Sequence, residues 1–473
     1  MKRALAIALL ALGACDPAPR TPPASPPPSA PTGTRQNVLL ITIDTLRADH
    51  LGAYGYARPT SPRLDAFAQR AVVFDQAYTY WPKTRGSFVA MMSGRRDSQT
   101  GYGKSHPLLL DFNPTLAEVL KRAGYRTAAV VDNPNVAAQH GYARGFDRYR
   151  ETWLQQEGLA TEMDRTRAIT GDGVSYLGTA PADQPFFLWL HYVNPHAPYT
   201  PPAPYDTAFL QDGAAQQGPR LRAVDGFVGG IRKEWAVAGQ DRLGYYVAQY
   251  DGEIAAVDQE VGKVLDALGR SPHAARTLVV VTSDHGESLG EHGYYFDHGQ
   301  DLHDPCLRIP LIVAQPGVAG GTRSTELAST LDLVPTVLDA VKVSYPPDLA
   351  GTSLLPALRG QPLGRERLFA RNDRNLSAGF DARLKVVATP TETDLRYQLF
   401  DRAADPGETK DASRAKPEDL RVARRELELF LARAEREWSH TRRILGGTPG
   451  ARRMDPAACE QLKALGYVVP ECQ

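Results

Sequence analysis

Residues 278–293 are LVVVTSDHGESLGEHG. The first four residues are apolar and mostly β-branched, which is typical of a buried strand in a parallel sheet. Such a strand would place Asp284 and His285 together at its carboxyl end, where open α/β sheets bind ligands. An adjacent carboxylate and imidazole, followed by glycine, suit a divalent metal ion. The alternative is a polar loop with incidental histidines, because a short motif alone is only a hypothesis.

A second apolar strand also ends in an acid. Residues 37–44 are NVLLITID, so Asp44 follows directly on the strand. An Asp in this place commonly caps a helix instead. If Asp44 reaches the same sheet edge as Asp284 and His285, the three form a plausible ligand set. That set predicts one divalent ion, either Ca²⁺, Mg²⁺, Mn²⁺ or Zn²⁺.

Strands alternate with helices over residues 37–360. This order predicts an α/β domain with a large, mixed but mostly parallel sheet sandwiched by helices. Residues 203–234 lack a clear period and are expected to form a surface insertion. Further strands are expected at 126–131, 186–193 and 308–313, and helices at 115–123, 243–268 and 332–341.

The pattern changes after about residue 360. Residues 384–388 and 397–400 resemble short antiparallel strands, and a charged helix is expected over 417–438. We therefore predict a catalytic domain over 37–360 and a small α+β subdomain with a tail over 361–473.

The first residues have the anatomy of an export signal. Residues 4–12 are apolar but too short to span a membrane permanently. They end in Leu-Gly-Ala-Cys, which resembles a bacterial lipobox, so residues 1–15 are expected to be a lipoprotein signal with lipidation at Cys15. The Pro-rich residues 16–36 are expected to form an extended linker. The protein would then be lipid-anchored to the bacterial cell envelope and face the periplasm. The alternative is an ordinary signal peptide with an incidental cysteine.

Acidic and basic residues balance at 54 each, so the formal net charge is zero. No global field attracts nucleic acid, and no nucleic-acid partner is expected. Among the other cysteines, Cys306 is expected to be a core thiol. Cys459 and Cys472 could form a disulfide in an oxidising compartment.

A candidate nucleophile lies in residues 81–93, WPKTRGSFVAMMS. Thr84 and Ser87 precede or open a short helix, whose backbone N–H groups and dipole favour an alkoxide. A bound metal would favour it further. The alternative is that both residues cap the helix, and we prefer this for Ser87.

A series of short motifs occurs in a fixed order along the chain, at residues 43–49, 93–95, 124–127, 191–196, 283–286, 332–336, 399–401, 405–406 and 462–467. Together these motifs resemble the sulfatase family of the alkaline phosphatase superfamily. The resemblance covers roughly residues 37–470 and implies an alkaline-phosphatase-like fold. It also implies a hydrolase acting on an anionic sulfate or phosphate ester.

The departures from that family concern the nucleophile. Members with sulfatase chemistry carry Cys-x-Pro-Ser-Arg, whose cysteine is oxidised to formylglycine, and this motif falls on residues 84–88. Thr84 takes the cysteine position and Phe88 the arginine position, so formylglycine cannot form. Thr84 can still attack as an alkoxide, as phosphodiesterases and phosphoglycerol transferases of the superfamily do. Thr45 replaces a second acid, and residues 128–133 replace cationic sulfate contacts.

The resemblance also assigns roles to two histidines and an arginine. His196 matches a histidine that binds the ester or protonates the leaving group, and His298 matches a second anion contact. Either could instead be an ordinary loop histidine. Arg47 would contact the anion or brace its loop, and His191 is expected to be structural.

Three functions remain open. The first is a metal-dependent hydrolase of sulfate or phosphate esters that uses Thr84. The second is a phosphodiesterase or a phosphoglycerol- or phosphoethanolamine-type transferase on envelope lipids or glycans. The third is a non-catalytic binding lipoprotein that keeps the fold.

Overall fold

The computed structural model describes residues 35–154, 159, 161–211, 213–226, 228–345, 347–446 and 456–465. The predicted signal segment with Cys15, most of the predicted linker, and Cys472 lie outside the described residues. None of the described helices is long and apolar enough to cross a membrane.

Strand β1 lies inside an eight-stranded sheet with the order β12-β2-β11-β8-β1-β5-β3-β4. It pairs in parallel with β8 on one side and with β5 on the other. Only β11 runs against its neighbours, which confirms the predicted mixed, mostly parallel sheet. The strands are β1 Asn37–Ile43, β2 Val72–Tyr78, β3 Arg126–Val131, β4 Arg148–Glu151, β5 Phe186–Tyr192, β8 Thr277–Thr282, β11 Leu311–Ala314 and β12 Thr322–Ser329.

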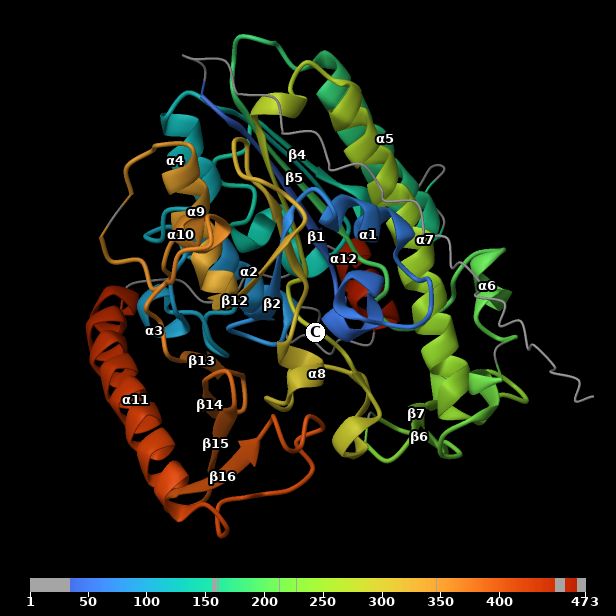
Figure 1. Cartoon of the computed structure of the whole chain (residues 1–473), viewed down its shortest axis with the longest axis vertical. Coiled ribbons are helices and arrows are strands. Elements are labelled where there is room, and N and C mark those ends of the chain that lie inside the picture. The colour runs from blue at the N-terminus through green and yellow to red at the C-terminus, as the bar shows by residue number, and fades with distance from the viewer. Residues whose placement is uncertain are drawn as a thin grey trace, which may run out of the picture.

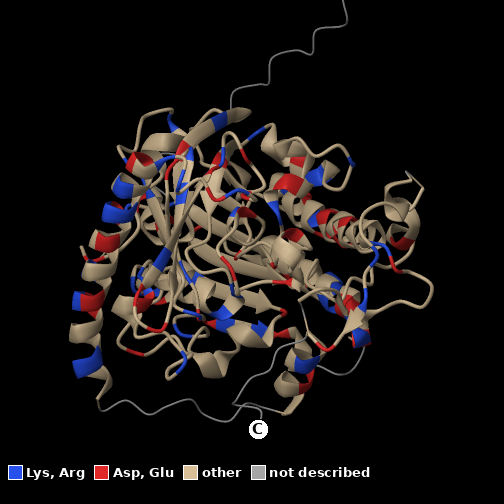
Figure 2. Cartoon of the chain, turned by 90° about the horizontal axis from the view of Figure 1, so that it is seen from below, with Lys and Arg blue, Asp and Glu red and all other residues tan. Residues whose placement is uncertain are grey.

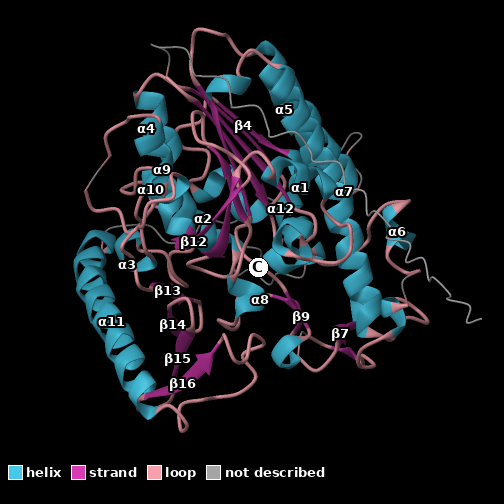
Figure 3. Cartoon of the chain, in the orientation of Figure 1, coloured by secondary structure: helices cyan, strands magenta, loops and turns pink. Residues whose placement is uncertain are grey.

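Alternate residues of β1 enter two separate cores, because successive side chains of a strand point to opposite faces. Val38 and Leu40 belong to the core that contains α2, α4 and α9, and Leu39 and Ile41 to the core that contains α5 and α7. The sheet is therefore covered by helices on both faces (Figure 1; Figure 3). These helices are α1 Pro62–Ala68, α2 Thr84–Ser93, α4 Leu116–Arg122, α5 Glu162–Thr179, α7 Leu243–Arg270, α9 Leu333–Ala340 and α10 Leu355–Leu358. The short helix α3 Asp97–Thr100 packs against the long helix α11 Pro417–Leu445.

The local signals that predicted these helices are visible in the structure. Thr115 caps α4, and a capping box joins it to Glu118. Gly124 follows that helix in the left-handed conformation, with φ 89°. The predicted strand at 308–313 begins later, at Leu311, and runs antiparallel to β8 because the chain returns alongside that strand.

A second, antiparallel sheet with the order β13-β14-β15-β16 lies beside the first, with α11 packed on it (Figure 1). The rings of Phe369 and Phe430 stack at 4.4 Å between this sheet and α11. The predicted α+β character is therefore confirmed, although α12 contacts the segments Pro134–Val136 and Thr152–Leu154 next to the large sheet. The domain boundary near residue 360 stays a prediction. The elements are β13 Leu368–Arg371, β14 Ser377–Phe380, β15 Leu384–Pro390, β16 Leu395–Asp401, α11 Pro417–Leu445 and α12 Pro456–Ala464.

The predicted insertion contains only short elements and leaves many of its described residues exposed. It holds α6 Tyr205–Ala208 and the two-residue strands β6 Ala223–Val224 and β7 Ile231–Arg232. The remaining short elements, β9 Ser288–Leu289, β10 Tyr295–Asp297 and α8 Asp304–Leu307, lie in the loop that follows β8.

Basic and acidic residues are interspersed over the chain (Figure 2), as the zero net charge suggests. The predicted core thiol Cys306 is buried and free. Cys459 is disulfide-bonded, and its predicted partner Cys472 lies outside the described residues.

Candidate active site

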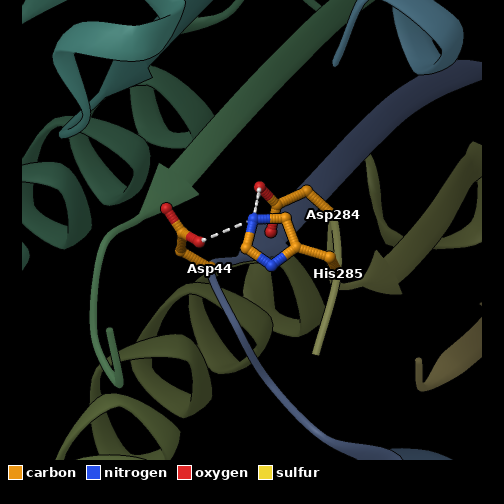
Figure 4. Close-up of side chains that lie close together, drawn as sticks. All are labelled: Asp44, Asp284 and His285. Carbon is orange, nitrogen blue, oxygen red and sulfur yellow. Dashed lines mark ion pairs between the residues drawn. The ribbon is translucent and has the colours of Figure 1, made fainter. Parts of the chain in front are cut away.

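The ends of two neighbouring strands bring together the three predicted metal ligands. Asp44 follows β1, and Asp284 and His285 follow β8. Nε2 of His285 lies 3.3 Å from Oδ2 of Asp284 and 3.7 Å from Oδ1 of Asp44. Figure 4 shows the imidazole facing both carboxylates. Among the described residues, these three form the group of acids and histidines whose ligand atoms lie within 4.8 Å of one another.

The donor atoms of this group fit a divalent cation. Oδ1 of Asp44 and Oδ2 of Asp284 are buried and accept no hydrogen bond from any described residue. Buried oxygens of this kind are costly unless a partner satisfies them. Two carboxylates and one imidazole are also a common donor set for Zn²⁺ or Mn²⁺. The structure therefore supports the predicted site, while the identity of the ion stays open.

The pKa values of these groups show the electrostatic cost of the arrangement. Burial, and then the neighbouring Asp284 carboxylate, raise the pKa of Asp44 well above its usual range. Burial raises the pKa of Asp284 to about 7 and lowers the pKa of His285 to about 3. A cation beside the two carboxylates would offset their repulsion and favour their ionised forms.

Thr84 is the first residue of α2, and its hydroxyl points to this group. Oγ1 of Thr84 lies 3.2 Å from Nε2 of His285, so a hydroxyl and the metal ligands share one site. The expectation that Ser87 caps the helix is wrong, because the cap position is Lys83. Ser87 lies one turn inside α2 and donates a 2.7 Å hydrogen bond to the carbonyl of Asp284, which ties the helix to the ligand loop.

The chain path after His285 depends on a glycine. A Cβ atom on Gly286 would lie 2.0 Å from the carbonyl oxygen of Pro305, and the N–H of Gly286 donates to the carbonyl of Cys306 at 3.0 Å. A side chain here would push the loop away from the sheet. Gly286 thus fixes where Asp284 and His285 point.

Asn133 is a site residue that the sequence motifs did not reveal. Its Nδ2 donates a 2.6 Å hydrogen bond to Oδ2 of Asp44, and its Oδ1 accepts from the N–H of Asn135 at 2.9 Å. Asn133 follows β3, whose carboxyl end lies at the same sheet edge. The strand-end rule that identified Asp44 could have identified it.

The two predicted histidines also reach the site. The ring centroids of His298 and His285 lie 4.1 Å apart, and those of His298 and His196 lie 5.1 Å apart. Burial, with a smaller contribution from the charge of His285, lowers the pKa of His196 to about 4, although the hydrogen bond to the carbonyl of Ala197 opposes this shift. Burial and nearby cationic groups hold the pKa of His298 well below its usual range.

Arg47 lies outside this cluster, and its contacts favour the alternative that it braces its loop and does not contact the anion. Its guanidinium donates to Asp49 at 2.8 and 3.0 Å, to Glu291 at 2.8 Å and to the carbonyl of Glu287 at 3.1 Å. These acids use most of its donors, and Arg47 lines a separate pocket of about 580 Å³. It therefore holds the loop after His285 in place.

His191, expected to be structural, lies at the margin of the site. Its Nδ1 bonds with Thr42 at 3.0 Å, and its Nε2 lies 3.7 Å from Oδ2 of Asp44. The ring of Phe88 packs edge-on against it, with centroids 4.8 Å apart. At the position of the family arginine, this chain therefore has an apolar contact.

Thr45, at the position of the second acid, adopts a left-handed backbone with φ 54°, which is uncommon for a β-branched residue. Its hydroxyl is buried without a partner among the described residues. Strained backbone of this kind is frequent at functional sites.

Comparison with known proteins agrees with this geometry. The profile of the sulfatase family matches residues 36–343, and that of the N-sulphoglucosamine sulphohydrolase C-terminal region matches residues 290–429. The chain belongs to the sulfatase family, a family of ester hydrolases, and its fold is that of the alkaline phosphatase superfamily.

Two relatives and one solved structure illustrate the likeness. Delta 4,5-hexuronate-2-O-sulfatase of Bacteroides thetaiotaomicron is 24% identical over 414 residues, which cover 80% of this chain and 85% of the relative. Human N-sulphoglucosamine sulphohydrolase is 28% identical over 360 residues, which cover 69% of this chain and 67% of the relative. The solved structure of the phosphonate monoester hydrolase of Agrobacterium radiobacter superposes with a TM-score of 0.70 at 22% identity. The superposition covers 85% of this chain and 96% of that protein.

Proposed function

We propose that the protein is a metal-dependent hydrolase of sulfate or phosphate esters whose nucleophile is Thr84. The observation that carries this proposal is the 3.2 Å separation between the Thr84 hydroxyl and Nε2 of His285. The hydroxyl opens a helix, where N–H groups and the positive dipole end favour negative charge. Asp44, Asp284 and His285 would hold one divalent ion, which supplies Lewis-acid polarisation of the ester and favours ionisation of a nearby hydroxyl.

The residues of the chain then have separate tasks. The Thr84 hydroxyl releases its proton to solvent and its ionised Oγ1 attacks sulfur or phosphorus, so that a covalent ester forms on Oγ1 while the bond to the leaving oxygen breaks. His196 or His298 gives a proton to the leaving oxygen. Water resolves the Thr84 ester and regenerates the hydroxyl.

A transferase is the second candidate, because a covalent ester on Thr84 could also be resolved by an alcohol of a lipid or glycan. The names of the two relatives given above refer to a hexuronate 2-O-sulfate and to N-sulphoglucosamine. A sulfated or phosphorylated glycan is therefore the first substrate class to test. We also propose that the chain is lipid-anchored through Cys15 and faces the periplasm, on the basis of the lipobox-like sequence.

Side-by-side turnover of an aryl sulfate, an aryl phosphate monoester and an aryl phosphate diester tests the proposal. We expect at least one to be cleaved with added divalent metal and not after chelation. Thr84→Val, which keeps the shape but removes the hydroxyl, should abolish turnover. Thr84→Ser, which keeps a hydroxyl, should retain part of it. Unchanged turnover in Thr84→Val would exclude Thr84 as nucleophile.

A further inference from the structure

A cavity of about 630 Å³ lies where α11 packs against α3, and neither the metal ligands nor Thr84 line it. Its walls come from the loop 101–106 after α3, from the last turns of α11, and from the turn that joins β13 to β14. Figure 1 shows α3 beside α11 in this region. A cavity of this size is in the range of sites that hold small molecules.

The cavity borders the proposed nucleophile. Trp81 lines the cavity and stands three residues before Thr84, so their Cα atoms lie at most about 11 Å apart. A Cβ atom on Gly86 would lie 2.3 Å from an indole carbon of Trp81, so this indole packs directly on α2. Asp373, another residue of the cavity wall, pairs with Nζ of Lys83 at 3.6 Å. A group bound in the cavity can therefore belong to the same molecule as an ester held at Thr84.

Aromatic side chains form part of the cavity wall. The rings of Trp81 and Tyr102 meet edge to face, with centroids 5.4 Å apart. Trp438, near the end of α11, is half-buried and also lines the cavity. The C–H faces of a pyranose ring are apolar and pack on aromatic rings, whereas its hydroxyls need polar partners. The aromatic surface therefore suits a sugar if polar groups lie nearby.

Such a polar group is Arg371, whose side chain is not fully used by the protein. Its Nη1 donates to Oδ2 of Asp97 at 2.7 Å. Its Nε is buried and has no hydrogen-bond partner among the described residues. A buried donor without a partner is costly until an acceptor reaches it. The hydroxyl oxygen of a sugar can be that acceptor.

The charges that line the cavity favour an acidic ligand. Lys104, in the loop after α3, is exposed and forms no ion pair with any described residue. The acids of the cavity wall already pair with other cations, so they do not neutralise Lys104. These pairs are Asp97–Arg371, Asp373–Lys83 and Glu435–Arg442. An unpaired cation beside these neutral pairs attracts a ligand that carries a negative charge.

We propose that this cavity binds a sugar ring of the substrate that carries a carboxylate or sulfate of its own, next to the group that bears the scissile ester. The ring packs on Trp438, its hydroxyls bond Arg371, and its anionic group pairs with Lys104. This inference rests on the proposed hydrolase function and narrows its substrate to an acidic glycan.

Direct binding to the full chain tests this assignment without turnover. Isothermal titration calorimetry with the Thr84→Val protein uses as probes the disaccharides that bacterial lyases release from heparin, chondroitin sulfate and hyaluronan. We expect saturable binding of at least one of these acidic disaccharides. Trp438→Ala should raise its Kd about 10-fold, because the sugar loses its aromatic contact.

Trp235→Ala is the matched control. Trp235 is also half-buried and also packs against an arginine, Arg232, at 4.9 Å from its ring, but it does not line the cavity. Its substitution should leave the Kd unchanged. Equal Kd values in the two tryptophan variants, or no saturable binding of any probe, would overturn the inference.

A surface variant keeps the question decidable if Trp438→Ala does not fold. Lys104→Glu changes an exposed side chain and should raise the Kd about 5-fold at low ionic strength. Lys342→Glu, at an exposed lysine outside the cavity, makes the same change in net charge and should have no effect. An unchanged Kd in Lys104→Glu would refute the acidic character of the ligand.

The inference and the proposed function can fail separately. A wild type that cleaves aryl esters but binds no acidic disaccharide would keep the hydrolase and refute the sugar site. Binding that depends on Trp438 and Lys104, in a protein that cleaves no ester, would support the sugar site and refute the hydrolase.

Discussion

Replacing Asn133 by serine removes the hydrogen bond between the segment that follows β3 and the side chain of Asp44. Nδ2 of Asn133 donates to Oδ2 of Asp44 at 2.6 Å, and both side chains are fully buried. Serine is too short to reach Asp44. It can still accept from the N–H of Asn135, as Oδ1 of Asn133 does, so the 3-10 turn at Pro134–Val136 keeps its cap.

The size of the effect follows from this geometry. A buried hydrogen bond to a charged group contributes about 1.5–3 kcal/mol, and about 1.4 kcal/mol is a factor of ten. The hydrogen bond from Asn133 also lowers the pKa of Asp44, opposing burial, so its loss makes the metal-binding ionised form harder to reach. We therefore expect the dissociation constant of the metal to rise about 10- to 100-fold, the range usual for partners of metal ligands.

Isothermal titration calorimetry with the ion that the wild type binds most tightly, among Ca²⁺, Mg²⁺, Mn²⁺ and Zn²⁺, measures this change. Asn135→Ser is the control, because Asn135 is equally buried and its Nδ2 has no partner among the described residues. Without metal, Asn133→Ser should melt a few degrees below the wild type because it also loses the hydrogen bond to Asp44, whereas Asn135→Ser should melt close to the wild type. An unchanged dissociation constant in Asn133→Ser, or the same weakening in Asn135→Ser, would refute the reasoning.

Three further outcomes are expected. Asp284→Ala should abolish stoichiometric metal binding because it deletes one of the two carboxylate ligands. Atomic absorption after dialysis measures the bound metal, and retained metal would contradict the assignment of Asp284 as a ligand. Arg47→Ala should destabilise the fold by about 1–2 kcal/mol in urea unfolding without changing KM, since the ion pairs it loses are to the partly exposed acids Asp49 and Glu291. A large rise in KM would instead favour anion contact. Burial raises the pKa of Glu253 from 4.5 to about 7, so its protonated form adds stability below pH 4.5 that is lost as pH rises through 7. Glu253→Gln should therefore gain up to about 3 kcal/mol relative to wild type between pH 4.5 and 8, and parallel pH profiles would contradict this.

The metal ligands could be predicted from the sequence because the carboxyl ends of buried strands can be located from the hydrophobic pattern. Asp44 directly follows an apolar run that is typical of a buried strand, and Asp284 follows another after two polar residues. Parallel strands place the residues at their carboxyl ends along one edge of the sheet. Thr84 required the family motif, because nothing local distinguishes a nucleophile from a helix cap. Ser87 shows that ambiguity, since a hydroxyl near a helix start turned out to bond the Asp284 carbonyl from inside the helix.

Other features depend on contacts between segments that the sequence does not pair. Glu287 stands in the quoted motif, yet its partner His298 lies 11 positions further on, beyond a turn whose path no local pattern fixes. The partners of Arg47 are likewise set by how the loop after β8 folds back onto β1. The sequence predicted a mixed sheet, but it did not identify β11 as the antiparallel strand, for the same reason.

The location of the site at strand ends links metal binding to folding. Thr84 and His285 are 201 positions apart, and Asn133 and Asp44 are 89 apart, so the cluster exists only when β8, β1 and β3 are all paired. A fragment that lacks any of these strands would carry the residues without the site. Because the ion would bind the native chain and not the unfolded one, metal at 100 times its dissociation constant would add about 2.7 kcal/mol to the free energy of unfolding. Metal titration would thus measure how much of a preparation has completed its central sheet.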